Sequence, residues 1–232
     1  MQQETENMTD YTPLVQIFRD KIKTYQENGK KIFASSSFQS HSIPMLHLIS
    51  QIDASIPVYF LNTGYHFAET LAFKAEVAQQ FGLQLREAAS PIPKIAQRDA
   101  NGLLFFAKDP DYCCYLNKTL PMEPMLAEYD VWISGVRRDQ NANRSRFAYE
   151  MPGKYGTLRF HPMLEWTNAM IARYIKDHQL PQHPLEGKGY LSVGCEPCTQ
   201  SIAQMNAQNE REGRWAGLKK TECGLHTDLI AQ

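Results

Sequence analysis

The sequence predicts an α/β domain built on a doubly wound, mostly parallel β-sheet. Short runs rich in β-branched and aromatic residues alternate along the chain with longer segments of helical period. Strands that alternate with helices pair in parallel and carry helices on both faces of the sheet. A length of 232 residues suits one such domain.

Each expected element has its own signal. Pro13 starts a helical pattern that ends at Gly29, and Phe81-Gly82 ends another helix that begins near residue 66. A third helix follows the Ser-rich turn SSSFQSHS. The expected strands are KIFAS (31–35), VYFLN (58–62), LQLRE (83–87) and DVWIS (130–134). Ligands bind at the carboxyl ends of parallel strands, so the candidate site loops are SSSFQSHS, NTGYHF and SGVRRDQ.

The chain divides into three parts. Residues 1–12 are polar and are expected to be flexible, and residues 13–205 are expected to form the α/β domain. From about Leu180 the sequence is rich in Pro and Gly and predicts an ordered loop that carries a site. Residues 206–232 form a functional C-terminal segment.

Composition excludes several classes of protein. Lys and Arg number 24 against 25 for Asp and Glu, so no global basic field favours nucleic acid or an anionic membrane. No apolar run approaches the roughly 20 residues of a membrane helix. The N-terminus has neither the basic flank nor the apolar core of a signal peptide. These features predict a soluble, cytoplasmic protein.

The 5 cysteines point to metal or thiol chemistry, because an odd number in a chain without an export signal argues against a disulfide framework. Cys195 and Cys198 form a CxxC pair, a spacing that lets two thiolates converge on one centre. Cys113 and Cys114 are adjacent and could face the same centre only if the backbone bends locally. Zinc and a 4Fe–4S cluster both accept four thiolates, and spacing alone does not separate them.

Cys223 is the remaining thiol. It lies in the segment Lys-Lys-Thr-Glu-Cys-Gly-Leu-His, where Lys219, Lys220 and His226 would favour the reactive thiolate. The alternative is an incidental surface cysteine.

Several cations follow the expected strands or glycines. Arg137 and Arg138 come directly after Gly135 and Val136 at a strand end, with Arg144 and Arg146 just beyond. Arginines in such loops suit bidentate capture of phosphate or sulfate, although any single one could be a solvated charge. The Ser-rich turn before a helix also resembles an anion-binding turn. Arg211 and Arg214 lie in the segment Arg-Glu-Gly-Arg-Trp, and Lys118 follows the adjacent cysteine pair.

Together these motifs resemble the APS/PAPS reductases of sulfate assimilation, which act on adenylyl sulfate (APS) or its 3′-phosphorylated form (PAPS). The motifs occur in the same order as in this family, from about residue 35 to residue 226. The resemblance is strongest to the iron–sulfur APS branch, because PAPS-specific enzymes generally lack the CC…CxxC set. It implies a fold of the adenine nucleotide alpha hydrolase-like (PP-loop) type. The segments that carry it are SSSFQSHS, LNTGYHFAETL, CCYLNKTLPM, WISGVRRDQNANR, EWTNAMIARYIKDHQLPQHPLEGKGYLSVGCEPCTQ, REGRW and KTECGLH.

The resemblance also implies roles. Cys223 would attack the sulfur of APS, release AMP and form an S-sulfocysteine, which thioredoxin or glutaredoxin would reduce. The 4Fe–4S cluster would be bound by Cys113, Cys114, Cys195 and Cys198. The phosphosulfate would be held by Lys118, Arg211, Arg214 and His226, assisted by Arg137 and Arg138. The nucleotide pocket would include Ser35, Ser36, Ser37, Asn62, Thr63, Gly64 and Gly135.

The sequence departs from the family pattern at three places that bear on nucleotide contact. Gln39-Ser40-His41-Ser42 stands where the family has a Gly-Ala-Glu-Asp-like stretch. Asn62 replaces an aspartate, and Asn117 replaces an arginine. These changes affect how firmly a 3′-phosphate is excluded.

Three other functions remain open. The chain could be a PAPS reductase or an enzyme that accepts both nucleotides. An ATP pyrophosphatase of the same superfamily would need an SGGxDS-like loop, which is missing. A four-cysteine zinc site could brace a non-enzymatic domain. No thioredoxin-like domain follows Cys223, so an external thiol donor is expected, and the sequence leaves open whether the chain forms a homo-oligomer.

Overall fold

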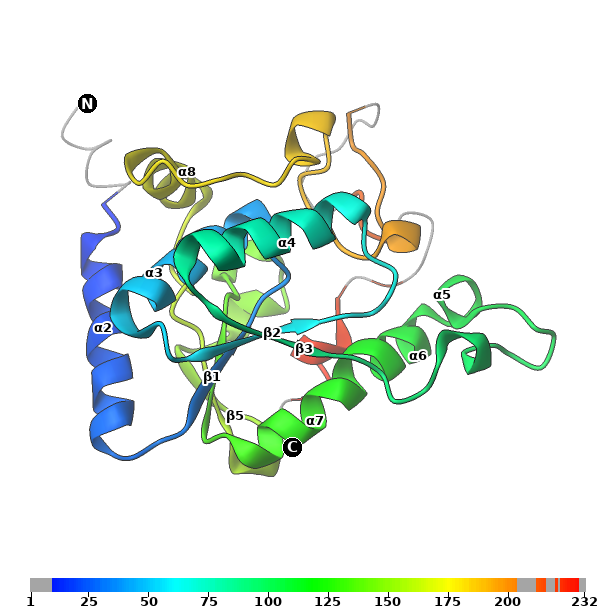
Figure 1. Cartoon of the computed structure of the whole chain (residues 1–232), viewed down its shortest axis with the longest axis horizontal. Helices are drawn as coiled ribbons and strands as arrows, with labels where there is room; N and C mark the ends of the chain where they lie inside the picture. Colours follow the sequence, from blue (N-terminus) through cyan, green and yellow to red (C-terminus); the bar gives the residue numbers. More distant parts are fainter. Residues whose placement is uncertain (1–9, 204–211, 216–219, 221, 230–232) are drawn as a thin grey trace.

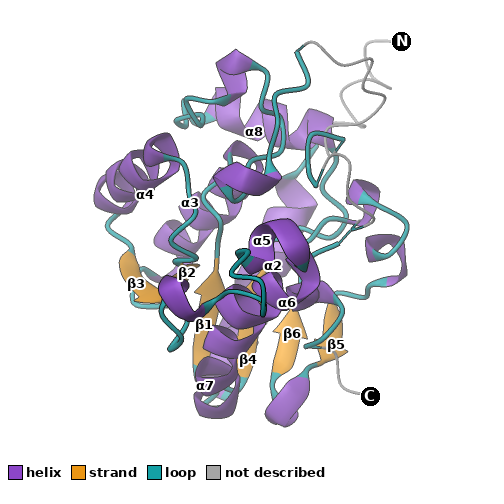
Figure 2. Ribbon diagram, turned by 90° about the vertical axis from the view of Figure 1, so that its right-hand side faces the viewer, coloured by secondary structure: helices purple, strands orange, loops and turns teal. Residues whose placement is uncertain are grey.

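The fold is built on a sheet of strand order β3-β2-β1-β4-β6-β5 (Figures 1 and 2). The computed structural model describes residues 10–203, 212–215, 220 and 222–229. Pairing is parallel throughout except between β5 and β6, which are antiparallel. The strands are β1 (Ile32–Ser35), β2 (Pro57–Leu61), β3 (Gln84–Ala88), β4 (Val131–Ser134), β5 (Glu150–Pro152) and β6 (Leu158–Phe160).

Helices lie before β1, between the successive strands from β1 to β4, and after β6. Those on the first half of the chain are α2 (Thr12–Glu27), α3 (Ile43–Asp53) and α4 (Ala68–Phe81). Between β3 and β4 lie α5 (Phe105–Lys108), α6 (Pro110–Cys114), a π-helical turn (Tyr115–Thr119) and α7 (Leu120–Glu128), and α8 (Asn168–Asp177) follows β6.

The central strands are buried on both faces because their side chains alternate between two cores. On one face, Ala34 of β1 and Ile133 of β4 belong to a cluster with apolar residues of α2, α3, α4 and α8. On the other face, Phe33 and Trp132 pack with residues of α7 and with Leu229 of the C-terminal segment. The sheet is therefore covered on both sides, as expected.

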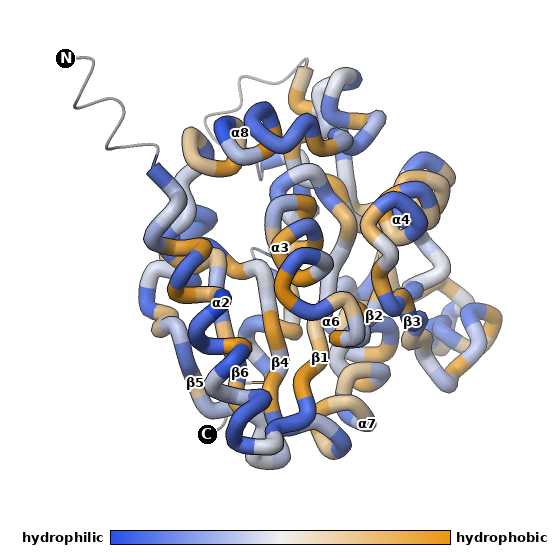
Figure 3. Tube along the Cα trace, turned by 60° about the vertical axis from the view of Figure 1, so that its left-hand side comes forward, coloured by the Kyte–Doolittle hydropathy of each residue, from blue (hydrophilic) through white to orange (hydrophobic). Residues whose placement is uncertain are grey.

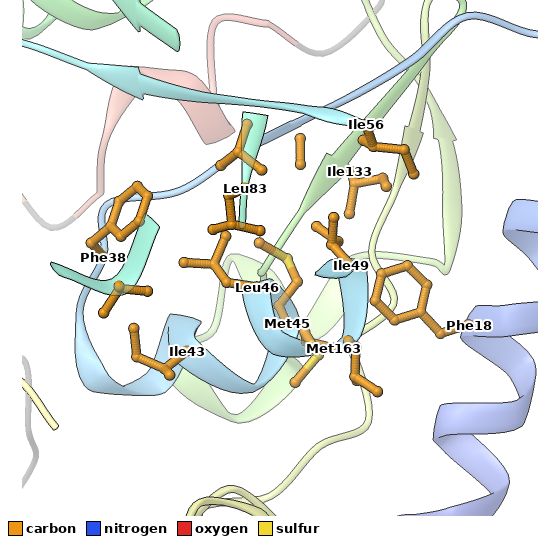
Figure 4. Packing of buried hydrophobic residues seen from close by; sticks show 14 of the residues in the cluster. Phe18, Phe38, Ile43, Met45, Leu46, Ile49, Ile56, Leu83, Ile133 and Met163 are labelled. Carbon is orange, nitrogen blue, oxygen red and sulfur yellow. The ribbon is translucent and has the colours of Figure 1, made fainter. Parts of the chain in front are cut away.

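The larger core is centred on α3. Figure 4 shows Met45, Leu46 and Ile49 of this helix against Ile133 of the sheet, with Phe18 of α2 at the side. Each of these side chains is buried, which stabilises the fold by about 1.5–3 kcal/mol per large apolar side chain. Figure 3 shows the same pattern as hydrophobic colour along β1 and β4.

Most expected elements are confirmed. The four predicted strands agree with β1–β4 to within about two residues, and the helices expected at Pro13 and near residue 66 are α2 and α4. Gly82 ends α4 with a φ of +62°, a conformation that suits glycine best. Strands β5 and β6, the helices of 105–128 and α8 were not predicted.

The expected flexible segment 1–12 is only partly described, and Thr12 already belongs to α2. No helix among the described residues is long and apolar enough to span a bilayer.

Candidate active site

A cavity of about 430 Å³ opens at the carboxyl edge of the parallel strands, the edge predicted to bind ligand. Its volume lies in the range of small-molecule sites. The turn after β1, the end of β4 and the C-terminal segment all contribute to its wall. The site residues predicted from the sequence that line it are Ser35, Ser36, Ser37, Lys118, Gly135, Arg137, Cys195, Arg214, Cys223 and His226.

The turn after β1 is held in place by short-range and cross-strand bonds. Trp132 Nε1 on β4 donates a 2.8 Å hydrogen bond to Ser35 Oγ, and Ser36 Oγ accepts one of 3.0 Å from the Phe38 N–H. Phe38 has a φ of +55°, so the chain turns sharply here before the 3₁₀ turn Ser40–Ser42 and α3. This geometry places hydroxyl and backbone groups of residues 35–37 at the cavity.

The loop after β2 has a different role from the one predicted. Asn62 Oδ1 accepts a 3.0 Å bond from the Gly64 N–H, and Asn62 Nδ2 donates 2.8 Å to Glu87 on β3. Asn62 and Gly64 are therefore used in closing their own turn and are not part of the cavity wall. Thr63 Oγ1 lies 3.3 Å from Cys195 Sγ and faces the cysteine site instead.

The four clustered cysteines line one smaller cavity. Cys113 and Cys114 end α6, and the π-helical turn that follows is the local bend expected for two adjacent residues facing one site. Cys195 and Cys198 come from the loop before the C-terminal segment. All four are free thiols, and three of them are buried.

The thiols are close enough to affect one another. Burial, and then repulsion from Cys195 and Cys198, raises the pKa of Cys113 to about 11. Burial and Cys195 also raise the pKa of Cys198. Four thiolates in this space would repel strongly unless a cationic centre lay between them, so the donor set fits a bound metal group.

The thiols do not converge on a single point. Among the residues that the structure describes, no group of three or more His, Cys, Asp or Glu side chains is arranged to hold one metal ion.

Lys118 lies in the π-helical turn and lines both cavities. Burial acts to lower its pKa, but the neighbouring Cys223, Cys195 and Cys114 outweigh this effect and raise the pKa. Lys118 is therefore a charged group between the cysteine site and the larger cavity.

The C-terminal segment carries Cys223 to the cavity through a buried ion pair. Glu222 accepts bonds of 2.8 and 2.9 Å from Arg144 Nε and Nη2, and one of 2.6 Å from Asn141 Nδ2. The Cys223 N–H also donates to Glu222 Oε1 at 2.8 Å. The nucleophile candidate is thus fixed by its neighbour in the chain.

The thiol of Cys223 lies against Cys114. A hydrogen bond between the two lowers the pKa of Cys223; burial acts in the opposite direction, and the charge of Lys118 lowers the pKa further. The same bond and burial raise the pKa of Cys114. The geometry therefore favours Cys223 as the thiolate of this pair.

Adjacent arginines after β4 point to different places. Arg137 is buried, lines the cavity and lies 3.6 Å from Asp139. Arg138 instead bonds Glu165 at 2.6 and 2.9 Å and the Ser145 carbonyl at 2.6 Å, on the surface. The structure thus does not support Arg138 as a substrate contact. Arg211 lies outside the described residues.

Arg214 is placed by the loop that carries the CxxC pair. It pairs with Thr199 in an isolated β-bridge, its Nη1 donates 3.4 Å to the Val193 carbonyl, and its guanidinium stacks 4.5 Å from the ring of Trp215.

Some site residues were not predicted from the sequence. Trp132 lines the cavity, and so does Arg144, which also pairs with Glu222. Arg159 on β6 lies behind Trp132 and His226. Arg144 was noted only as one of several cations, and no local pattern marked the others, because their neighbours are distant in sequence.

Comparison with known proteins identifies the family of the chain. Residues 31–201 match the phosphoadenosine phosphosulfate reductase domain. The chain is 37% identical over 210 residues to the adenosine 5′-phosphosulfate reductase of Halalkalibacterium halodurans, covering 89% of this chain and 90% of the relative. It is 36% identical over 202 residues to the phosphoadenosine 5′-phosphosulfate reductase of Gloeobacter violaceus, covering 85% and 83%.

A solved structure supports the fold. The phosphoadenylyl-sulfate reductase of Candida auris, in a phosphate complex, superimposes with a TM-score of 0.66 at 18% identity and covers 84% of this chain and 96% of its own. The domain match over most of the chain and the two relatives lead to one conclusion. The chain belongs to the phosphoadenosine phosphosulfate reductase family, and the relatives it matches include enzymes named for APS and for PAPS.

Proposed function

We propose that the chain reduces APS to sulfite and AMP in sulfate assimilation, through an S-sulfocysteine on Cys223. The observation that carries this proposal is one cavity at the nucleotide-binding edge of the sheet whose wall contains a cysteine thiol together with Lys118, Arg214 and His226. The name of the Halalkalibacterium halodurans relative supports the choice of substrate.

The first chemical step is attack by the Cys223 thiolate on the sulfur of APS. A bond forms between Cys223 Sγ and that sulfur, while the bond from the sulfur to the phosphate oxygen breaks and AMP leaves with the electron pair. The two reacting groups are both anionic, so the step depends on positive charge held around them. Lys118 and Arg214 would supply this positive charge, and each would stabilise the transition state by about 2–4 kcal/mol.

The second step needs an external dithiol, which we propose is thioredoxin or glutaredoxin. One thiolate of the reductant attacks Cys223 Sγ, and sulfite leaves with the electron pair of the S–S bond. The second thiol of the reductant then displaces Cys223, and the reductant becomes a disulfide. Such thiols are kept reduced in the cytoplasm, where we place the reaction.

We further propose that Cys113, Cys114, Cys195 and Cys198 hold a 4Fe–4S cluster. Their common cavity and their mutual repulsion support this assignment over separate structural thiols. With its four thiolates such a cluster is an anionic group, and Lys118 would compensate its charge. Cys114 bound to iron has no proton to donate, so Lys118 would then be the group that favours the Cys223 thiolate.

A covalent adduct is the most direct test of the proposed chemistry. Holding the purified protein with APS and no reductant should add the mass of one SO₃ to the peptide that contains Cys223. Reduced thioredoxin should remove that mass and release sulfite. Cys223→Ser should keep its iron and lose turnover. An unmodified Cys223 peptide, or normal turnover by the serine variant, would exclude this mechanism.

The cluster and the substrate choice have separate tests. Anaerobically purified protein should be brown and contain about four irons and acid-labile sulfide per chain. Stoichiometric zinc would instead show that the cysteines bind zinc and not a cluster. The ratio of kcat/KM for APS and PAPS decides the substrate. We expect APS to be preferred; equal turnover would make the enzyme dual-specific, consistent with the name of the Gloeobacter violaceus relative.

A further inference from the structure

Arg159 is a buried cation that the proposed reaction does not use. It lies on the edge-side strand β6 with 0% of its surface exposed and is absent from the cavity wall. Within the described part of the chain no carboxylate lies within ion-pair distance of it, and its Nε and Nη1 have no hydrogen-bond partner. A buried charge without a counter-ion is costly, so its position calls for an explanation.

Aromatic rings and one histidine surround the guanidinium. Its carbon lies 4.7 Å from the ring of Trp132 and 5.5 Å from that of Phe147, distances at which ring faces attract a cation. Burial, and then repulsion from Arg144, lowers the pKa of Arg159 to about 10, so it remains charged at neutral pH. Its Nη2 lies 3.3 Å from Nδ1 of His226.

The contact with His226 fixes the position of a proton. A guanidinium has donors and no acceptor, so Nδ1 of His226 must accept this hydrogen bond with its lone pair. The neutral ring then carries its proton on Nε2. The ring of Phe147 lies edge-on to the same imidazole, with 6.4 Å between the two ring centroids.

We propose that Arg159 is a positioning residue that holds His226 as the Nε2–H tautomer, a neutral hydrogen-bond donor in the wall of the anion-binding cavity. The role of the donor rests on the proposed function, because the anion it would meet is the phosphosulfate of the substrate. The tautomer itself does not depend on the reaction. Arg159 thus acts through His226 and touches neither the substrate nor the nucleophile.

The tautomer can be measured on the unmodified holoenzyme. Labelling histidines with ¹⁵N and assigning the His226 signals by their loss in His226→Gln gives separate shifts for the two ring nitrogens. We expect protonated Nε2 and unprotonated Nδ1 at neutral pH, both without ligand and with AMP bound. A protonated Nδ1, in either the other tautomer or an imidazolium, would overturn the proposal whatever the activity of the enzyme.

Variants test whether the contact matters for turnover. Arg159→Met should lower kcat/KM for APS by about tenfold to a hundredfold, mostly through kcat, and Arg159→Lys, which can still donate to Nδ1, should recover most of the loss. In the His226→Gln background, Arg159→Met should cause no further loss. Arg19→Met, on the exposed side of α2, is the matched control and should be neutral.

Additive losses in the double variant would show that Arg159 acts independently of His226 and would overturn the proposal. AMP binding and thermal unfolding of each variant separate this result from a loss of fold. If Arg159→Met does not fold, the lysine variant and the ¹⁵N shifts of the unmodified protein still decide the question. If no APS reduction is found at all, the ¹⁵N measurement is unaffected.

Discussion

The buried pair between Arg144 and Glu222 should hold the Cys223 segment in place, and Glu222→Ala tests it. The side chains of Arg144 and Glu222 are 8% and 4% exposed, and the carboxylate accepts from Arg144, Asn141 and the Cys223 N–H. The change removes the carboxylate and leaves Arg144 buried without it. Asn141 and the backbone of Cys223 lose the same acceptor.

The expected cost follows from burial. Removing one partner of a buried, hydrogen-bonded ion pair costs about 3–5 kcal/mol, because the remaining charge is uncompensated. Arg144 also lies near Arg159, and its charge lowers the pKa of Arg159. Arg159 is therefore a second positive charge and cannot compensate for the lost carboxylate of Glu222. A cost of this size shifts the equilibrium between the docked and the detached segment by more than about a hundredfold.

An exposed pair of the same chemistry provides the matched control. Arg138 bonds Glu165 at 2.6 and 2.9 Å, but the two side chains are 40% and 42% exposed. Exposed pairs contribute about 0–1 kcal/mol, so Glu165→Ala should have little effect. The comparison also tests Arg138, because the removal of its surface partner should not change kcat/KM if Arg138 is not a substrate contact.

The assay is the rate at which iodoacetamide alkylates Cys223 under anaerobic conditions, followed by mass spectrometry of its peptide. Glu222→Ala should raise this rate at least about tenfold, and Glu165→Ala should leave it unchanged. Urea unfolding followed by circular dichroism would show whether the rest of the fold is intact. Equal alkylation rates for the two variants would refute the idea that the buried pair docks the segment.

Three further changes probe other parts of the site. Lys118→Ala should lower kcat/KM for APS by a factor that corresponds to about 2–4 kcal/mol of transition-state stabilisation, because the cation beside the reacting thiol is lost. Near-normal kinetics would contradict the role assigned to Lys118. Gly194→Ala should lower kcat/KM but change the unfolding free energy by less than about 1 kcal/mol, because the new methyl overlaps the Arg214 guanidinium; unchanged kinetics would show that Arg214 is not needed there. His161 is fully buried, and its pKa in the folded protein is lowered to about 4. As pH falls, the unfolded chain therefore binds a proton at this residue before the folded protein does, and stability is lost from about pH 6.5 toward pH 4. Urea titrations should show a loss of about 2 kcal/mol between pH 7.5 and 5 that His161→Asn removes; an equal loss in the variant would assign it to other groups.

The fold was predictable where burial in the folded protein leaves a recognisable pattern within a short stretch of the sequence. The strands β1, β2 and β4 are buried on both faces and therefore read as short apolar runs. Strands β5 and β6, at the end of the sheet opposite β3, have only three residues each, and β5 includes Pro152, so they carry no such pattern. Their existence depends on pairing with β4 and with each other, which no short window of sequence contains.

The site was predictable where residue type alone restricts the chemistry. Cysteines at CxxC spacing and a strand-end loop of serines have few other uses, and the structure brings Cys113 and Cys195 to one cavity. Arginines are less specific. Arg137 has an extended backbone and Arg138 begins the 3₁₀ turn Arg138–Gln140, and only the side chain of Arg137 reaches the cavity. The sequence does not say which one.

The charges of the C-terminal segment link its docking to binding of the substrate. The body of the domain supplies the cations that neutralise the segment, since Arg144 pairs with Glu222 and Lys118 lies by Cys223. The segment in turn brings His226 to the cavity wall. A dianionic nucleotide that meets His226 therefore binds the docked form better than the detached form. By mass action, AMP should slow the alkylation of Cys223, and it should do so more weakly in Glu222→Ala, where docking has lost its own ion pair.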